Sequence, residues 1–256
     1  MKIVVCIKQV PDSTAKVVVE GGKVSWGDAP MVMNPWDEYA VEAALQQKEA
    51  LGGTVTAVTI GDESCKEALK RALAMGADDA ILINDPTLAT LDTQGTAQVL
   101  AAFIQKTGGV DMAFFGRQAI DGDSGLVPMQ SARLLNWPSL TFASVIKADG
   151  GSVRVQRSVE EGRQIVTTKL PAVFSLTKDF GEPRYPSFMG IRKASRAEIP
   201  TWNLVNLGIA APAPVISWPE RMNPVSRDVT CEMITGGSPD EIAETLVNKI
   251  LAEKVL

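Results

Sequence analysis

The chain has 256 residues, a formal net charge of -5 at pH 7 and no histidine. Without imidazole it cannot form a Ser-His-Asp triad, a histidine proton shuttle or a histidine-ligated zinc site. The acidic balance argues against nucleic acid as a partner, because nucleic-acid binding normally requires a basic domain or a basic stripe. The length leaves room for one large core or two unequal ones.

The cysteines and the apolar runs indicate the compartment. Cys6, Cys65 and Cys231 are far apart and form no CxxC pair, so neither a zinc ribbon nor a dithiol couple is expected. The first residues predict a strand rather than a secretory leader. No apolar run reaches the roughly 18 residues of a membrane span. We therefore expect a cytoplasmic protein without a metal site.

Buried strands and amphipathic helices alternate in the first half. Continuous apolar runs predict buried parallel strands at Lys2–Val10, Val55–Gly61, Ala80–Ile83 and Met112–Phe115. Helices are predicted after Asn34, after Asp62 or Ser64, at Asp92–Gln105 and from about Pro128. Asn34 is the expected N-cap of the first helix, with Pro35 at its first position. The alternation predicts an α/β fold with a doubly wound, mostly parallel sheet.

The second half has a different character. Additional short strands, of the antiparallel edge type, are predicted at Leu140–Ile146, Val153–Arg157 and Gln164–Thr168. From Pro171 to Pro224 prolines recur with little periodicity, so we expect this segment to cross a surface.

The C-terminal residues predict a helical arm. Ser238 and Glu241 form a capping box before a helix at Ile242–Val255, and Gly236-Gly237 precede it. The double glycine favours a detachable arm at residues 236–256, beside a nucleotide-binding domain at residues 1–235. Packing of this helix on its own sheet is the equal alternative.

The loop from Gly116 to Pro128 is the main candidate for a ligand site. The chain has neither a P-loop nor a GxGxxG motif, and ligands of open parallel sheets bind beyond the carboxyl ends of the strands. Gly122 and Gly125 let backbone N–H groups converge, the next helix adds its dipole, and Ser124 adds a hydroxyl, so the loop could bind a phosphate. The alternative is a solvated acidic turn in which Asp121 and Asp123 cap their own backbone.

Three further residues are expected at the same edge of the sheet. Cys6 ends the first strand and Ile60 the second, while Trp36 lies at the start of the first helix. We expect Cys6 to be a small buried filler rather than a nucleophile, because Lys8 is its only basic neighbour in the sequence. Trp36 could stack on a flat ring or could simply staple the helix to the sheet.

Four sequence blocks together resemble the beta subunit of an electron transfer flavoprotein. They are Cys6–Asp12, Met33–Asp37, Ala72–Asp78 and Gly116–Asp123. The segment from Val155 to Ser175 resembles the signature of the same family in the second half. The resemblance covers residues 1–200 well.

The resemblance implies a function as an electron carrier. In the family, the beta subunit holds an adenine nucleotide and pairs with an alpha subunit that holds the redox-active FAD. The heterodimer carries electrons from flavin dehydrogenases, such as acyl-CoA dehydrogenases, toward a quinone reductase, so the chain itself would not be an enzyme. The nucleotide is AMP in the common form and a second FAD in the electron-bifurcating form, which accepts electrons from NADH.

The resemblance also implies roles for individual residues. The nucleotide would be lined by Cys6, Asn34, Pro35, Trp36, Asp37, Ile60, Gln118, Asp121, Gly122, Asp123, Ser124, Gly125, Leu126 and Val127. Trp36 matches an aromatic position close to the flavin of the alpha subunit. Phe188 matches the apolar tip of a loop that docks dehydrogenases, and the last helix matches a segment that lies on the alpha subunit.

The resemblance leaves the identity of the nucleotide open. Family members have glutamine and glycine where this chain has Leu126 and Pro128, so the loop lacks a side-chain donor and a backbone N–H. Gly122 and Val127 resemble the bifurcating form. Two other segments, Leu135–Pro138 and Thr141–Ser144, resemble the AMP form.

Two functions of other classes remain as alternatives. One is an ATP-using adenylating enzyme on a related fold, which would need a glycine-rich loop after the first strand. Val10–Thr14 contains no glycine, which argues against it. The other is a free-standing nucleotide-sensing module.

Overall fold

A computed structural model describes residues 1–149, 151–217, 220–223, 225 and 230–253. The chain divides into two units, Met1–Arg221 and Met222–Leu256, each of which is described by itself. Helix α7 (Pro239–Ala252) lies in the second unit and begins at the predicted capping box of Ser238 and Glu241. The last residues of the predicted helix, 254 and 255, lie outside the described residues. The boundary at 235/236 stays a prediction.

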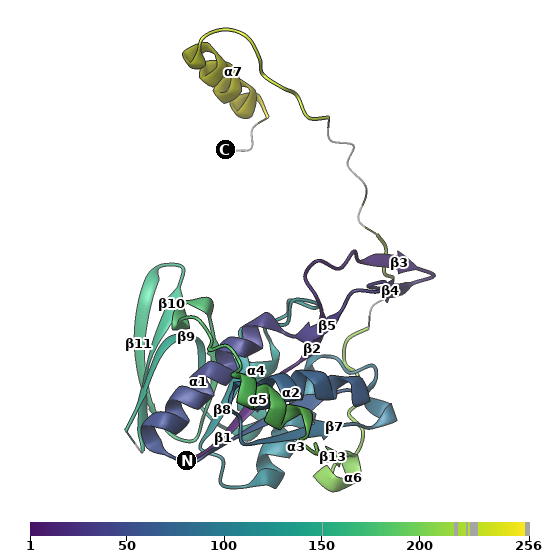
Figure 1. Ribbon diagram of the computed structural model, residues 1–256, viewed down its shortest axis with the longest axis vertical. Helices are drawn as coiled ribbons and strands as arrows, with labels where there is room; N and C mark the ends of the chain where they lie inside the picture. Colours follow the sequence, from purple (N-terminus) through teal and green to yellow (C-terminus); the bar gives the residue numbers. More distant parts are fainter. Residues whose placement is uncertain (150, 218–219, 224, 226–229, 254–256) are drawn as a thin grey trace. The chain divides into compact units, whose positions relative to one another are not determined.

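Within the described ranges, the first unit contains a nine-stranded sheet (Figure 1). In spatial order its strands are β11 (Gly162–Lys169), β10 (Ser152–Val159), β9 (Ser139–Ala148), β12 (Ala172–Leu176), β8 (Met112–Gly116), β1 (Lys2–Cys6), β6 (Thr54–Ile60), β7 (Asp79–Ile83) and β13 (Thr201–Trp202). Neighbours from β9 to β13 are parallel, and β10 pairs antiparallel with β9 and β11. The predicted mostly parallel α/β sheet with additional short strands is confirmed.

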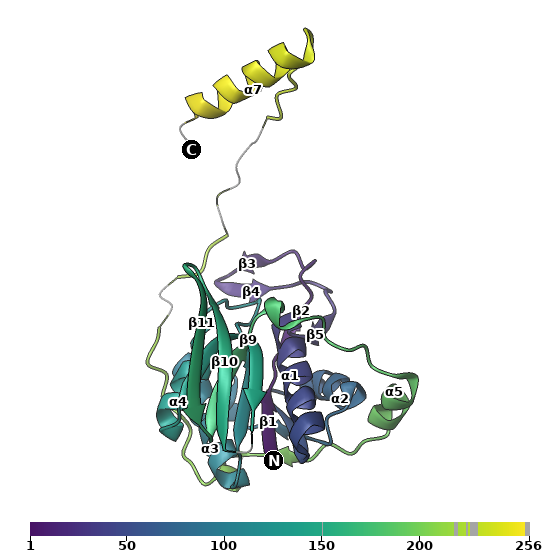
Figure 2. The same ribbon diagram turned by 90° about the vertical axis from the view of Figure 1, so that its left-hand side faces the viewer.

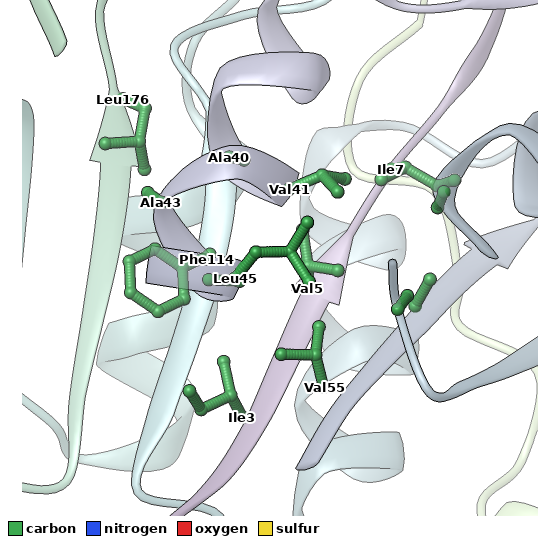
Figure 3. Packing of buried hydrophobic residues seen from close by; sticks show 14 of the residues in the cluster. Ile3, Val5, Ile7, Ala40, Val41, Ala43, Leu45, Val55, Phe114 and Leu176 are labelled. Atoms are coloured by element: carbon green, nitrogen blue, oxygen red, sulfur yellow. The ribbon is translucent and has the colours of Figure 1, made fainter. Parts of the chain in front are cut away.

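Helices cover both faces of this sheet (Figure 2). One face is covered by α1 (Pro35–Leu51) and α2 (Lys66–Met75), and the other by α3 (Thr93–Thr107) and α4 (Val127–Leu135). Figure 3 shows Ile3 and Val5 of β1 packed with Val41 and Leu45 of α1. Because Val4 points to the opposite face, β1 is buried on both sides, which explains its continuous apolar sequence.

Smaller elements complete the described residues. The short helices are η1 (Glu63–Cys65), η2 (Pro86–Leu88), η3 (Lys178–Phe180), α5 (Phe188–Ser195) and α6 (Leu204–Leu207). Two small antiparallel pairs are formed by β2 (Gln9–Pro11) with β5 (Met31–Met33) and by β3 (Val18–Glu20) with β4 (Lys23–Ser25). In the part of the chain that the structure describes, no helix has the length and apolarity to span a membrane.

The prediction of a single strand at Lys2–Val10 was wrong. The chain leaves the large sheet after Cys6, and Gln9–Pro11 pairs with β5 in a separate sheet. The Lys8 N–H donates to the Asp37 carboxylate, and the Lys8 carbonyl accepts from the Asn34 N–H. The start of α1 therefore takes the backbone groups of Lys8 that a neighbouring strand would otherwise use.

The prediction of a surface crossing from Pro171 to Pro224 was wrong for its first part. All five residues of β12 are buried, and the strand lies between β8 and β9 in the sheet. Short buried strands show no periodicity, and Ser175 interrupts the apolar run. The buried Ser175 hydroxyl has a hydrogen-bond partner, because it accepts from the Phe142 N–H at 3.2 Å.

Candidate functional site

The carboxyl ends of β1 and β8 mark the point where the strand order reverses. From β1 the chain goes on to β6 and β7 on one side, and it then returns to place β8 on the other side. Ligands of open α/β sheets bind in the crevice at such a point. Three segments meet here: Lys8 after β1, residues 34–37 at the start of α1, and the loop of residues 117–126 between β8 and α4.

Asn34 joins the start of α1 to this loop. Its side-chain nitrogen donates to the Gln118 carbonyl at 2.8 Å, and its side-chain oxygen accepts from the Ile120 N–H at 3.2 Å. Asn34 is the N-cap of α1, as predicted, but its side chain makes no capping bond to the helix. The residue is only 1% exposed, and its amide instead satisfies peptide groups of the loop.

Asp37 connects the ends of both strands. Its carboxylate accepts from the Lys8 N–H at 2.7 Å and also from the Gly116 N–H. Burial raises its pKa to about 7, although hydrogen bonds from Asn34, Lys8 and Gly116 favour the charged form. A Cβ at Gly116 would overlap this carboxylate, so the close approach requires glycine. The crevice therefore has at its base a buried acid that titrates near neutral pH.

The acidic residues of the loop accept hydrogen bonds from side chains rather than from their own backbone. Asp121 forms an ion pair with Lys8 at 2.6 Å, which ties the loop to the end of β1. Asp123 accepts from the side-chain amide of Gln118. These contacts argue against the self-capping alternative. The loop enters α4 through Leu126, which supplies no side-chain cap to the helix.

A pocket opens between the loop, the first half of β9 and the end of β12. It is lined by Arg117, Gln118, Asp123, Ser124, Gly125, Met129, Thr141, Phe142 and Ser175. The guanidinium carbon of Arg117 lies 5.5 Å from the centroid of the Trp36 ring and 5.6 Å from that of Phe142, within cation–π range. Four of the lining residues, Gln118, Asp123, Ser124 and Gly125, were predicted from the sequence to line a nucleotide.

The other five lining residues were not predicted from the sequence; they are Arg117, Met129, Thr141, Phe142 and Ser175. Arg117 had a signal, because it lies inside the Gly116–Asp123 block. Thr141 and Phe142 also had one, because they lie in the Thr141–Ser144 segment that resembles the AMP form. The left-handed φ of 58° at Phe142 and the irregular register between β9 and β12 appear only in the fold.

The remaining candidates occupy different surroundings. Cys6 is buried, and desolvation together with the charge of Asp37 raises its thiol pKa well above the ordinary value, which argues against a thiolate nucleophile. Ile60 ends β6 and packs against the core on the α3 face. Pro35, Gly122 and Leu126 are exposed, whereas Val127 is half-buried as the first residue of α4. Among the described residues, no group of three or more acidic, cysteine or histidine side chains is placed to hold a metal ion.

The fold is that of a doubly wound α/β protein, and the crevice lies at its topological switch point, where sheets of this kind bind ligands. The family model of the electron transfer flavoprotein domain matches residues 24–207, and the chain belongs to that family.

Three similar proteins cover almost all of the chain. It is 36% identical to the caffeyl-CoA reductase-Etf complex subunit CarD of Acetobacterium woodii and 36% identical to the electron transfer flavoprotein subunit beta of Megasphaera elsdenii, in both cases over 100% of each chain. It is also 36% identical to the electron transfer flavoprotein subunit beta of Bacillus subtilis, over 99% of this chain and 98% of that one. These relatives agree with the resemblance seen in the sequence blocks.

Proposed function

We propose that this chain is the beta subunit of a cytoplasmic, heterodimeric electron transfer flavoprotein and holds an adenine nucleotide in the crevice between β1 and β8. Its alpha partner would hold the redox-active FAD. The pair would carry electrons from flavin dehydrogenases, such as acyl-CoA dehydrogenases, toward a quinone reductase. The main support for the proposal is that Lys8, Asn34 and the 117–126 loop meet at the switch point of an electron transfer flavoprotein domain.

The groups that line the pocket beside this crevice fit an adenine nucleotide. The Arg117 guanidinium, the Ser124 hydroxyl and the positive end of the α4 dipole suit a phosphate. Met129 and Phe142 line the same pocket and suit an aromatic ring. No bond-making group is required of the chain, because a flavin supplies the redox chemistry and the protein supplies position and electrostatics.

We propose AMP as the nucleotide, which would then have a structural role. The electron-bifurcating form with a second FAD, reduced by NADH, is the second candidate. It is favoured by Gly122 and Val127, which resemble the bifurcating form. The flavin absorbance of the purified heterodimer distinguishes the two: AMP predicts about one FAD per heterodimer, and about two would favour the bifurcating form.

The C-terminal arm is proposed to pack on the alpha subunit. Leu246, Ile250 and Leu251 lie on one side of α7 and are exposed. An apolar stripe at helical spacing is typical of a helix that buries this side against another surface. A partner subunit would supply that surface.

Phe188 is proposed to dock the dehydrogenase, because its side chain is 80% exposed at the start of α5. We expect Phe188→Ala to raise the KM for the cognate dehydrogenase roughly thirty-fold, the effect of about 2 kcal/mol at an aromatic hot spot. Stopped-flow reduction of the heterodimer measures it, and cofactor content should not change. The control is Val205→Ala, which removes a similarly exposed apolar side chain from α6. Equal rates for wild type and Phe188→Ala would remove this role.

A further inference from the structure

Exposed apolar side chains are concentrated around the start of α5. Tyr185, Phe188, Met189 and Ile191 lie within seven positions, and each is between 52% and 91% exposed. Apolar side chains gathered in this way on a surface are typical of a site that contacts another protein. Short flexible segments lose affinity when they must become ordered on binding, so the way in which this segment is held matters for docking.

Arg184 holds the residues before α5 against α1. Its Nε donates to Glu42 Oε2 at 2.7 Å and its backbone N–H donates to the same oxygen at 3.1 Å. Its two terminal nitrogens donate to Glu49 at 2.5 and 3.1 Å, and one of them also donates to Glu42 Oε1 at 3.1 Å. Glu42 is buried, and Arg184 is two-thirds buried against it. Such forked, charge-assisted contacts fix geometry as well as adding stability.

The helix α5 itself is held against α2. A Cβ at Gly190 would overlap the Ala74 carbonyl, so the backbones of the two helices are in close contact at this point. Ala194 is buried in the same helix. Ser187 caps α5 by accepting from the Gly190 N–H at 2.9 Å. Figure 2 shows residues 181–187 running from beside α1 to α5, and α5 lies next to α2.

We propose that Arg184, Glu42 and Glu49 form a clamp that positions the docking residues before the partner arrives. Phe188 is the first residue of α5, so it lies between the clamp on α1 and the contact of Gly190 with α2. Arg184 is then a positioning residue that acts through Phe188. The inference rests on the docking role of Phe188 in the proposed function.

Two variants with opposite changes of charge test the clamp in the heterodimer. Arg184→Gln removes a positive charge, and Glu42→Met removes a negative one and leaves the Arg184 N–H without its acceptor. Both are expected to raise the KM for the dehydrogenase about ten-fold, with kcat and cofactor content unchanged. Arg192→Gln, which removes an exposed positive charge from α5, is the control and should stay close to wild type. Opposite effects of the first two variants would show charge steering and overturn the proposal.

Because Glu42 is buried, its replacement also affects packing. A further variant and a further readout therefore test the clamp in other ways. Glu49→Gln changes only the exposed acid of the clamp, and a two- to three-fold rise in KM is expected. Hydrogen exchange of the Arg184 amide reports on the clamp without the partner, and it should become faster in Glu42→Met. Unchanged exchange in a folded Glu42→Met chain would contradict the clamp.

A double-mutant cycle separates the clamp from the docking role itself. If Arg184 acts through Phe188, then Arg184→Gln should add little to the effect of Phe188→Ala. Additive effects would overturn the proposal. If Phe188→Ala alone has no effect, the docking role fails; if Phe188→Ala slows transfer and Arg184→Gln does not, only the clamp fails.

Discussion

Replacing Gly116 by alanine is expected to destabilise the chain by about 3 kcal/mol, the upper part of the range for overpacking, and to remove the nucleotide. The new Cβ would overlap the Asp37 carboxylate and would lie 2.8 Å from the Trp36 carbonyl carbon and 2.9 Å from the Asp37 nitrogen. Two of these three atoms belong to the backbone, and the third is in a buried acid. Gly116 cannot easily shift, because it ends β8, a strand that is paired with β1 and β12.

Gly122→Ala is the matched control for this prediction. It lies in the same loop, nothing lies within 4 Å of its added Cβ, and its φ is not left-handed. Its effect should stay within about 0.5 kcal/mol, as for most surface substitutions. Urea unfolding measures the stabilities of both variants, and the nucleotide content of the complex is measured for Gly116→Ala. Equal effects of the two alanines would contradict the close packing at Gly116.

The wild-type chain is expected to lose stability relative to Asp37→Asn as the pH rises from 4 to 8. The pKa of Asp37 is about 7 in the folded chain, against 3.8 for an unperturbed carboxyl. Between these values the folded state keeps a proton that the unfolded state has released, so raising the pH favours unfolding. At about 1.4 kcal/mol per pKa unit, the full effect is about 4 kcal/mol. The asparagine does not titrate, so the difference between the two chains isolates Asp37.

Urea unfolding at several pH values measures this difference. Asp85→Asn is the control, because hydrogen bonds from Thr87 lower the pKa of Asp85. The stability contributed by Asp85 is lost only as the pH falls through its lowered pKa, so the difference between wild type and Asp85→Asn should show no slope between pH 5 and 8. Parallel profiles for wild type and Asp37→Asn would mean that Asp37 has an ordinary pKa.

The sheet could be predicted because burial on both faces leaves a continuous apolar run, as in β1 and β8. The two errors came from long-range partners that leave no local pattern. The first strand ends at Cys6 because Asp37 takes the N–H of Lys8, 29 residues earlier. Ser175 interrupts the apolar run of β12, and its buried hydroxyl has a partner on another strand.

Part of the site could be predicted, and the rest depends on long-range contacts. The Gly116–Pro128 loop and the start of α1 were assigned to one edge, and the side chain of Asn34 does join them. The pairing of Arg117 with Phe142 depends on the course of β9, and the contact of Arg184 with Glu42 spans 142 residues. Neither leaves a signal in the spacing of residues.

The proposed function depends on an adenine nucleotide that this chain holds between β1 and β8. The most direct measurement is chromatography of the nucleotides released by acid from the chain purified with its alpha subunit, for wild type and Gly116→Ala. We expect one adenine nucleotide, AMP or FAD, in addition to the FAD of the alpha subunit, and its loss in Gly116→Ala while that FAD remains. A wild-type complex that releases no adenine nucleotide beyond one FAD would contradict it.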